Sequence, residues 1–181
     1  MQPINTVAGQ ELIWTRASKS PLVYELRAGD ITVAALRWQH GSLAEAETAD
    51  GQWTFKRAGF WHPRVTVRVP GSDADVALFA ANWHGGGSLH LAAERQFAWS
   101  AANFWHSQWA WKDAAGLPLM TFTSKRGTAP AEGQAEVALA ALDLPELSLL
   151  APLGWYLLLL QARDDQAATV AAIVPAISAA T

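Results

Sequence analysis

The chain of 181 residues contains no cysteine, which excludes disulfides, thiolate metal sites and cysteine nucleophiles. Positive charge is also scarce, because 13 Lys and Arg residues are outnumbered by 16 Asp and Glu residues. A nucleic-acid partner calls for a basic face, so we expect no such partner. Residues 1–15 lack a basic region followed by an apolar stretch, and no signal peptide is therefore expected. These absences predict a cytoplasmic protein.

Motifs of catalysis and of cofactor binding are missing as well. The chain has no Gly-x-Ser-x-Gly elbow, and Gly85-Gly86-Gly87 lacks the Lys and Ser or Thr that complete a phosphate-binding loop. His40 and His84 occupy related places, as do His62 and His106, but no HxH or HExxH spacing supports a metal site. We therefore expect no enzyme activity, no metal and no cofactor.

The abundant residue types indicate a folded core. Hydrophobic residues make up 51% of the chain, and ten Trp against two Tyr is a marked aromatic bias. The Trp residues are spread over most of the chain, which indicates that they belong to the core and not to one stacking platform. A chain of this length and composition is most simply a single domain, 1–181, with a sizeable core.

An apolar–polar alternation with a period of two runs from residue 11 to about residue 143 and predicts β-strands. Val65 and Val67, for example, flank Thr66. Turn signals such as Asp50-Gly51 separate the runs, and such short connections favour antiparallel neighbours. The predicted strands are 11–16, 21–27, 31–38, 42–48, 52–58, 64–69, 75–81, 88–93, 95–100, 107–113, 117–123 and 134–142, with a loop at 124–133.

The strand region contains an internal duplication. Phe60-Trp61-His62 recurs as Phe104-Trp105-His106, and each copy, 31–69 and 75–113, supplies four predicted strands. The simplest explanation of the repeated Phe-Trp-His is that the same corner of the sheet is used twice. Other residues occupy corresponding positions in the two copies: Trp38 corresponds to Trp83, Phe55 to Trp99, and Val67 to Trp111.

A short apolar run follows the strands. Leu147–Leu160 carries no charge, and Pro145 with Glu146 before it is typical of a helix start. The run is shorter than the roughly 20 apolar residues of a membrane span, which favours a buried helix over a membrane span or an interfacial helix. A helix that is apolar on all sides must be enclosed, and a closed sheet would enclose it.

The fold prediction is therefore mainly β: an antiparallel closed barrel of about twelve strands that encloses a C-terminal hydrophobic helix at 146–161. The alternative architecture is a β-sandwich with the helix packed outside. The Ala-rich tail, 166–181, is expected to form a short element that is limited by Pro175 and packs on the outside.

This layout resembles the tubby-like superfamily, with two repeated sets of strands and an apolar helix that contains Leu153-Gly154-Trp155-Tyr156-Leu157. The superfamily includes the tubby C-terminal domain, the plant LURP-one-related proteins and the phospholipid scramblases. The resemblance covers roughly Glu11 to Arg163 and implies a twelve-stranded barrel threaded by a hydrophobic helix. It also implies one of two functions. Tubby domains bind phosphoinositides, and scramblases are calcium-responsive membrane proteins. The chain has no Asp-rich loop with the spacing of a calcium site.

Cations concentrate on one predicted hairpin, formed by strands 52–58 and 64–69. Three of them are expected on the face opposite the apolar residues and two at the connecting corner, where together they could recognise phosphate or an anionic headgroup. Alternatively, the face is solvated and its charge is met by acids such as Glu45 and Glu47 on a neighbouring strand. The candidate site residues are Lys56, Arg64 and Arg68 on the face, with Arg57 and His62 at the corner.

The sequence thus predicts a non-enzymatic binding module for anionic lipid headgroups or phosphate at a membrane surface, which would place a cytoplasmic protein at the membrane periphery. One alternative is a structural or protein-interaction domain without a ligand. The other is a small-ligand enzyme at the barrel mouth. Only lipid recognition predicts salt-sensitive binding to anionic but not to neutral vesicles.

Overall fold

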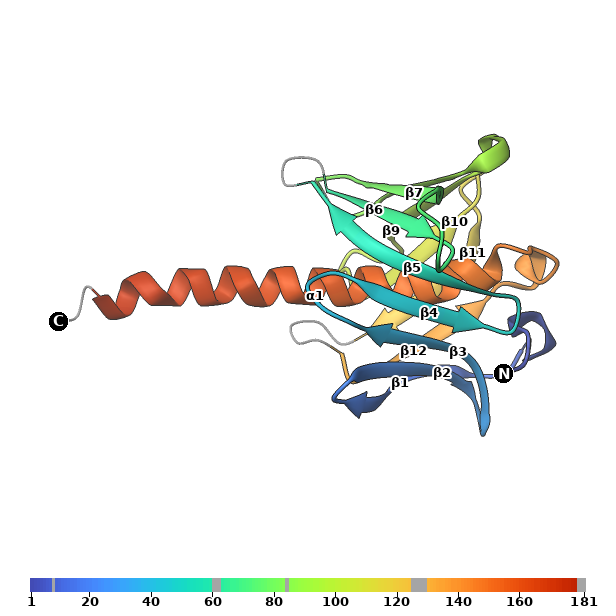
Figure 1. Cartoon of the computed structure of the whole chain (residues 1–181), viewed down its shortest axis with the longest axis horizontal. Helices are drawn as coiled ribbons and strands as arrows, with labels where there is room; N and C mark the ends of the chain where they lie inside the picture. Colours follow the sequence, from blue (N-terminus) through green and yellow to red (C-terminus); the bar gives the residue numbers. More distant parts are fainter. Residues whose placement is uncertain (8, 60–62, 84, 125–129, 179–181) are drawn as a thin grey trace.

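The computed structural model describes the chain except for residues 8, 60–62, 84, 125–129 and 179–181. Its strands form one closed antiparallel barrel, in which sequence neighbours pair and β1 pairs with β12 (Figure 1). The predicted closed barrel is confirmed, and each predicted strand overlaps an observed one. The strands are β1 (Leu12–Lys19), β2 (Leu22–Ala28), β3 (Ile31–Trp38), β4 (Ala44–Thr48), β5 (Gly51–Ala58), β6 (Arg64–Arg68), β7 (Asp75–Ala81), β8 (Gly87–Leu91), β9 (Gln96–Ala101), β10 (Gln108–Lys112), β11 (Pro118–Ser124) and β12 (Glu132–Val137).

One long helix, α1 (Leu147–Ser178), runs through the barrel (Figure 1). Every residue from 147 to 160 is buried, which explains why this segment has no polar face. We call the end of the barrel where α1 begins the basal end, and the end where α1 leaves the exit end. The β1–β2, β3–β4, β5–β6, β7–β8, β9–β10 and β11–β12 connections lie at the exit end. The remaining connections and the short 3-10 helix η1 (Ile4–Val7) lie at the basal end.

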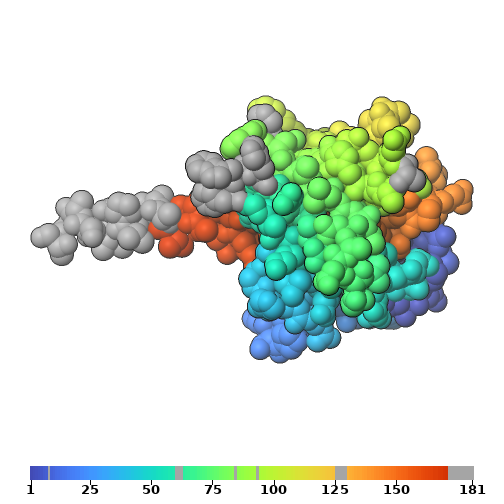
Figure 2. Space-filling view, turned by 45° about the horizontal axis from the view of Figure 1, so that its top comes forward, coloured from blue at the N-terminus to red at the C-terminus, as the bar shows by residue number. Residues whose placement is uncertain are grey.

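The helix is longer than the sequence predicts. The expected end at 161 and the expected separate element in 166–181 are both wrong, because α1 continues to Ser178 and passes Pro175. Residues 162–165 and the Ala-rich start of the tail are compatible with a helix, since Ala is the best helix former. Residues 163–170 are exposed and extend beyond the barrel (Figure 2). Within the part of the chain that the structure describes, no helix is long and apolar enough to cross a membrane.

Aromatic residues of the barrel wall pack directly on α1. Trp155 of the helix stacks on Trp14 of β1, with ring centroids 5.5 Å apart and planes inclined by 4°. Gly154 lets the Phe122 ring of β11 pack closely against α1, since a Cβ at this position would lie 2.5 Å from that ring. Gly133 of β12 is needed for a similar reason, because a Cβ there would lie 2.5 Å from Trp155. The helix is therefore the centre of the core.

The two copies of the repeat correspond to strands β3–β6 and β7–β10. Phe55 and its counterpart Trp99 are both buried against the helix side of the wall, as are Val67 and Trp111. Phe60-Trp61-His62 lies outside the described residues, whereas Phe104-Trp105-His106 lies in the β9–β10 connection. The repeat therefore preserves the inward positions of the strands.

Candidate functional site

The predicted cationic face lies on β5 and β6, which are neighbours as expected. Their register pairs Lys56 with Thr66 and places Arg64 and Arg68 in the same outward alternation. Phe55 and Val67 occupy the buried positions between them. The geometry, however, does not bring all four of the described predicted cations, Lys56, Arg57, Arg64 and Arg68, together on one free surface.

Arg68 lies at the basal end of β6, four residues from Arg64 and thus roughly 13 Å away along the strand. Its Nε lies 2.6 Å from Oδ1 of Asp75 on β7, and Nη1 lies 4.0 Å from Oδ1 of Asp73. The hydrogen bond and the charge of Asp75 raise the pKa of Arg68. The charge of this residue is therefore met by neighbouring acids, although by Asp75 and Asp73 and not by the expected Glu45 and Glu47.

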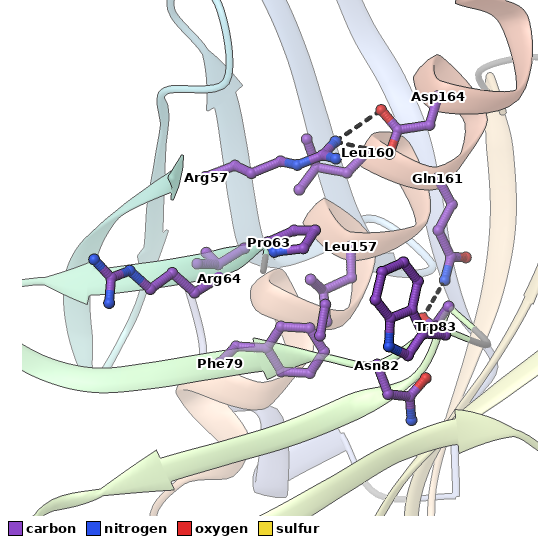
Figure 3. Close-up of a pocket in the computed structure, with 13 residues that line it drawn as sticks. Arg57, Pro63, Arg64, Phe79, Asn82, Trp83, Leu157, Leu160, Gln161 and Asp164 are labelled. Atoms are coloured by element: carbon purple, nitrogen blue, oxygen red, sulfur yellow. Dashed lines mark hydrogen bonds and ion pairs between the residues drawn. The ribbon is translucent and has the colours of Figure 1, made fainter. Parts of the chain in front are cut away.

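Arg57 points into the barrel mouth and not outwards. Its Nη1 lies 2.7 Å from both carboxylate oxygens of Asp164 on α1 (Figure 3). This ion pair joins the end of β5 to the helix where the helix leaves the barrel. His62 lies outside the described residues.

Two of the predicted cations remain available at the exit end. Lys56 and Arg64 are exposed, and neither forms an ion pair with a described residue. Both lie within two residues of the strand ends that lead to the β5–β6 connection. Of the four predicted cations that the structure describes, this pair is thus the part that is not engaged by acids.

Three large aromatic side chains are exposed at the same end. Trp83, in the β7–β8 connection, is 87% exposed, and Phe104 and Trp105, in the β9–β10 connection, are 86% and 73% exposed. Trp38, the repeat counterpart of Trp83, is only 5% exposed and stacks on Tyr156 of α1. The exposed rings therefore have no comparable role in the core.

Sequence reasoning missed these rings because the repeat assigns Trp83 the role of Trp38. The available signal was local: Trp83 lies directly before His84 and three glycines, a composition typical of a tight connection and not of a strand interior. Such a connection turns the side chain away from the barrel wall.

The two ends of the barrel also differ in charge. The comparison covers the described residues of the connections, of the three outermost positions of each strand at the respective end, and of the exposed part of α1. The exit end carries the cations Lys19, Arg37, Lys56, Arg57, Arg64 and Arg163 and the acids Glu45, Glu132, Asp164 and Asp165. The basal end carries the acids Glu11, Asp30, Glu47, Asp50, Asp73, Asp75, Glu94, Asp113, Glu136, Asp143 and Glu146 and the cations Arg27, Arg68, Arg95 and Lys112. An acidic chain thus presents one end on which cations predominate.

A pocket of about 310 Å³ opens at the exit end between α1 and strands β5–β7 (Figure 3). Gln161 borders it on one side, where its Nε2 donates a 2.7 Å hydrogen bond to the carbonyl of Gly85. The Arg57–Asp164 ion pair borders it on another side. The buried apolar walls are formed by Val65, Phe79, Leu157 and Leu160, and the polar rim includes Arg64 and Asn82 beside Trp83.

The described residues that line this pocket carry few titratable side chains, namely Arg57, Arg64 and Asp164. Those that line it include no Ser, Cys or His, and its one carboxylate, Asp164, is paired with Arg57. No group of three His, Asp or Glu that could hold a metal ion is found among the described residues.

Comparisons with protein-family models, with curated proteins and with solved structures found no match to this chain. The resemblance to the tubby-like superfamily therefore stays a prediction that rests on the layout of strands and helix.

Proposed function

We propose that the protein is a non-enzymatic module that binds anionic membrane surfaces through the exit end of its barrel. One observation carries the proposal: the exposed rings of Trp83, Phe104 and Trp105 lie at the same end as Lys56 and Arg64. Aromatic rings favour the interface between water and lipid, and Lys and Arg are attracted to anionic headgroups. The two preferences would act together on one surface.

The distribution of charge supports a single orientation on the membrane. Among the described residues, cations outnumber acids at the exit end, whereas acids outnumber cations at the basal end. An anionic surface would attract the first end and repel the second, since the field of a protein reflects the whole distribution of its charges. The net charge of −3 does not reveal this difference.

The exposed aromatic rings also favour a second candidate, a protein-interaction domain, because aromatic residues are enriched at protein interfaces. Membrane binding is the better-supported proposal because it uses both the rings and the two cations, Lys56 and Arg64, that form no ion pair with a described residue. A small-ligand enzyme at the barrel mouth is the weakest of the three functions, since the described pocket residues supply no nucleophile.

The test compares two pairs of cations on the same barrel. Sedimentation with phosphatidylserine-containing vesicles should show binding that weakens with salt, and neutral phosphatidylcholine vesicles should bind little. Lys56→Gln with Arg64→Gln should weaken binding about 30-fold, because each cation near an anionic surface contributes about 1 kcal/mol. The matched control, Arg68→Gln with Lys112→Gln at the basal end, should change binding less than about twofold. Absence of vesicle binding at low salt would overturn the proposal and favour the protein-interaction domain.

A further inference from the structure

The pocket at the exit end combines an apolar interior with a charged opening. Val65, Phe79 and Leu157 are each at most 5% exposed, so the pocket reaches the boundary of the core. Figure 3 shows the side chains of Phe79 from β7 and Leu157 from α1 next to each other, and both line the pocket. Its volume of about 310 Å³ reaches the range of roughly 300–1,000 Å³ in which proteins bind small molecules.

The charges at the opening favour an anionic group. Arg57 and Asp164 neutralise each other across a 2.7 Å ion pair, and Gln161 is engaged by Gly85. Arg64 lies at the rim, where its exposed side chain extends outwards from β6 (Figure 3), and it has no ion-pair partner among the described residues. One uncompensated cation therefore stands beside an apolar space, an arrangement that matches an anionic head joined to an apolar chain.

From this arrangement we infer that the pocket holds one acyl or alkyl chain of an anionic amphiphile, with the anionic head at Arg64 and Trp83 beside the opening. The inference rests on the proposed function in one respect: the opening lies on the surface that would face the membrane, from which such a chain could enter. It goes further by assigning the apolar chain, and not only the headgroup, to a defined cavity.

Ala81 offers a way to fill the pocket without touching the exposed rings. It lies on β7 in the same inward alternation as Phe79 and lines the pocket, whereas its neighbour Ala80 is exposed on the outer face. Ala81→Leu should occupy the cavity, and Ala80→Leu adds the same atoms outside. For the head, Arg64→Gln is matched by Arg68→Gln on the same strand and face.

Calorimetric titration with decyl phosphate, below the concentration at which it forms micelles, should show one saturable site. Ala81→Leu should weaken this binding at least tenfold, and Ala80→Leu should leave it within twofold. Arg64→Gln should weaken decyl phosphate binding about tenfold but leave 1-decanol binding unchanged, with Arg68→Gln neutral for both. Inorganic phosphate alone should bind at least a hundredfold more weakly, which separates a lipid from free phosphate.

Absence of saturable binding by the wild-type chain, or equal binding by the Ala81→Leu and Ala80→Leu variants, would overturn the inference. Should Ala81→Leu impair folding, methyl NMR of the wild-type chain tests the pocket directly. Decyl phosphate should shift the methyl resonances of Val65, Leu157 and Leu160 and leave those of Leu117, at the basal end, unchanged. Shifts at Leu117 alone would refute the pocket. Vesicle binding by Ala81→Leu should persist through the exposed rings, so failure of the pocket and failure of the proposed function give different results.

Discussion

The basal and exit ends of the barrel are built from the same strands but use their side chains differently. At the basal end, Arg68 pairs with Asp75, and Arg95 forms an ion pair with Glu146 ahead of the helix. At the exit end, the Arg57–Asp164 ion pair also joins the wall to the helix, but Arg64 has no such partner among the described residues.

Their apolar side chains differ in the same sense. Ile4 and Val7 of η1 are each 2% exposed and close the basal end, whereas three aromatic rings at the exit end are at least 73% exposed. Exposed Leu117 and Leu139 show that the basal end is not free of apolar surface, but it carries no comparable group of exposed rings among the described residues. Side chains that folding does not account for are therefore concentrated where α1 leaves the barrel, which is where we place function.

The largest effect is expected from the element that both ends share. Leu153 of α1 is fully buried inside the barrel, and Leu153→Asp would bury an unpaired charge at a cost of several kcal/mol, comparable to the whole stability of a domain. Circular dichroism and thermal melting should show loss of cooperative folding. Ala167→Asp, on the exposed part of the same helix, should change the unfolding free energy by less than about 0.5 kcal/mol. Similar losses in the two variants would contradict enclosure of the helix.

The next effect concerns the exposed rings alone. Replacing Trp83, Phe104 and Trp105 together by Ala should weaken binding to anionic vesicles at least about a hundredfold, because burial of one such ring contributes about 1.5–3 kcal/mol. The melting temperature should change little, since all three rings are exposed. Leu117→Ala with Leu139→Ala removes exposed apolar side chains from the basal end and should leave binding unchanged. An equal loss in both variants would show that the two ends are not different in function.

The smallest effect is a pH dependence at the exit end. The Tyr156 hydroxyl donates a 2.5 Å hydrogen bond to the carbonyl of Ser42 and ties α1 to the β3–β4 connection. Burial raises the pKa of the Tyr156 phenol well above its ordinary value. The folded state therefore favours the protonated phenol, and this contribution is complete below the unfolded pKa of about 10 and is lost as pH rises towards the folded pKa.

Urea unfolding of the wild-type chain and of Tyr156→Phe measures this contribution. Between pH 8 and pH 10.5 the wild-type unfolding free energy should fall by roughly 1 kcal/mol more than that of the variant, since Phe cannot ionise. Parallel pH profiles would mean that Tyr156 ionises equally in both states, and the proposed anchor would then be wrong.

The strands and the enclosed helix could be predicted because their signals are local. Alternation around Val65 and Val67 predicts a strand whatever its neighbours are, and an apolar run without a polar face predicts enclosure. The predicted end of the helix at residue 161 is wrong because no local signal stops a helix there. The barrel wall ends near this residue, but residues that favour a helix continue beyond it. The outward direction of Lys56 was predictable for the same local reason.

The sequence by itself determined which segments are strands, which faces are apolar and that the run at 147–160 must be buried, since periodicity is set within a few residues. Only the tertiary structure decided how charges are met: Arg57 pairs with Asp164, 107 residues away, and Arg68 with Asp75 across a strand pair. Closure of the barrel also decided that Trp38 is covered by α1 while Trp83 is exposed, because the contact depends on where the helix leaves the barrel. The candidate site arises from those long-range placements, and a one-dimensional pattern does not contain them.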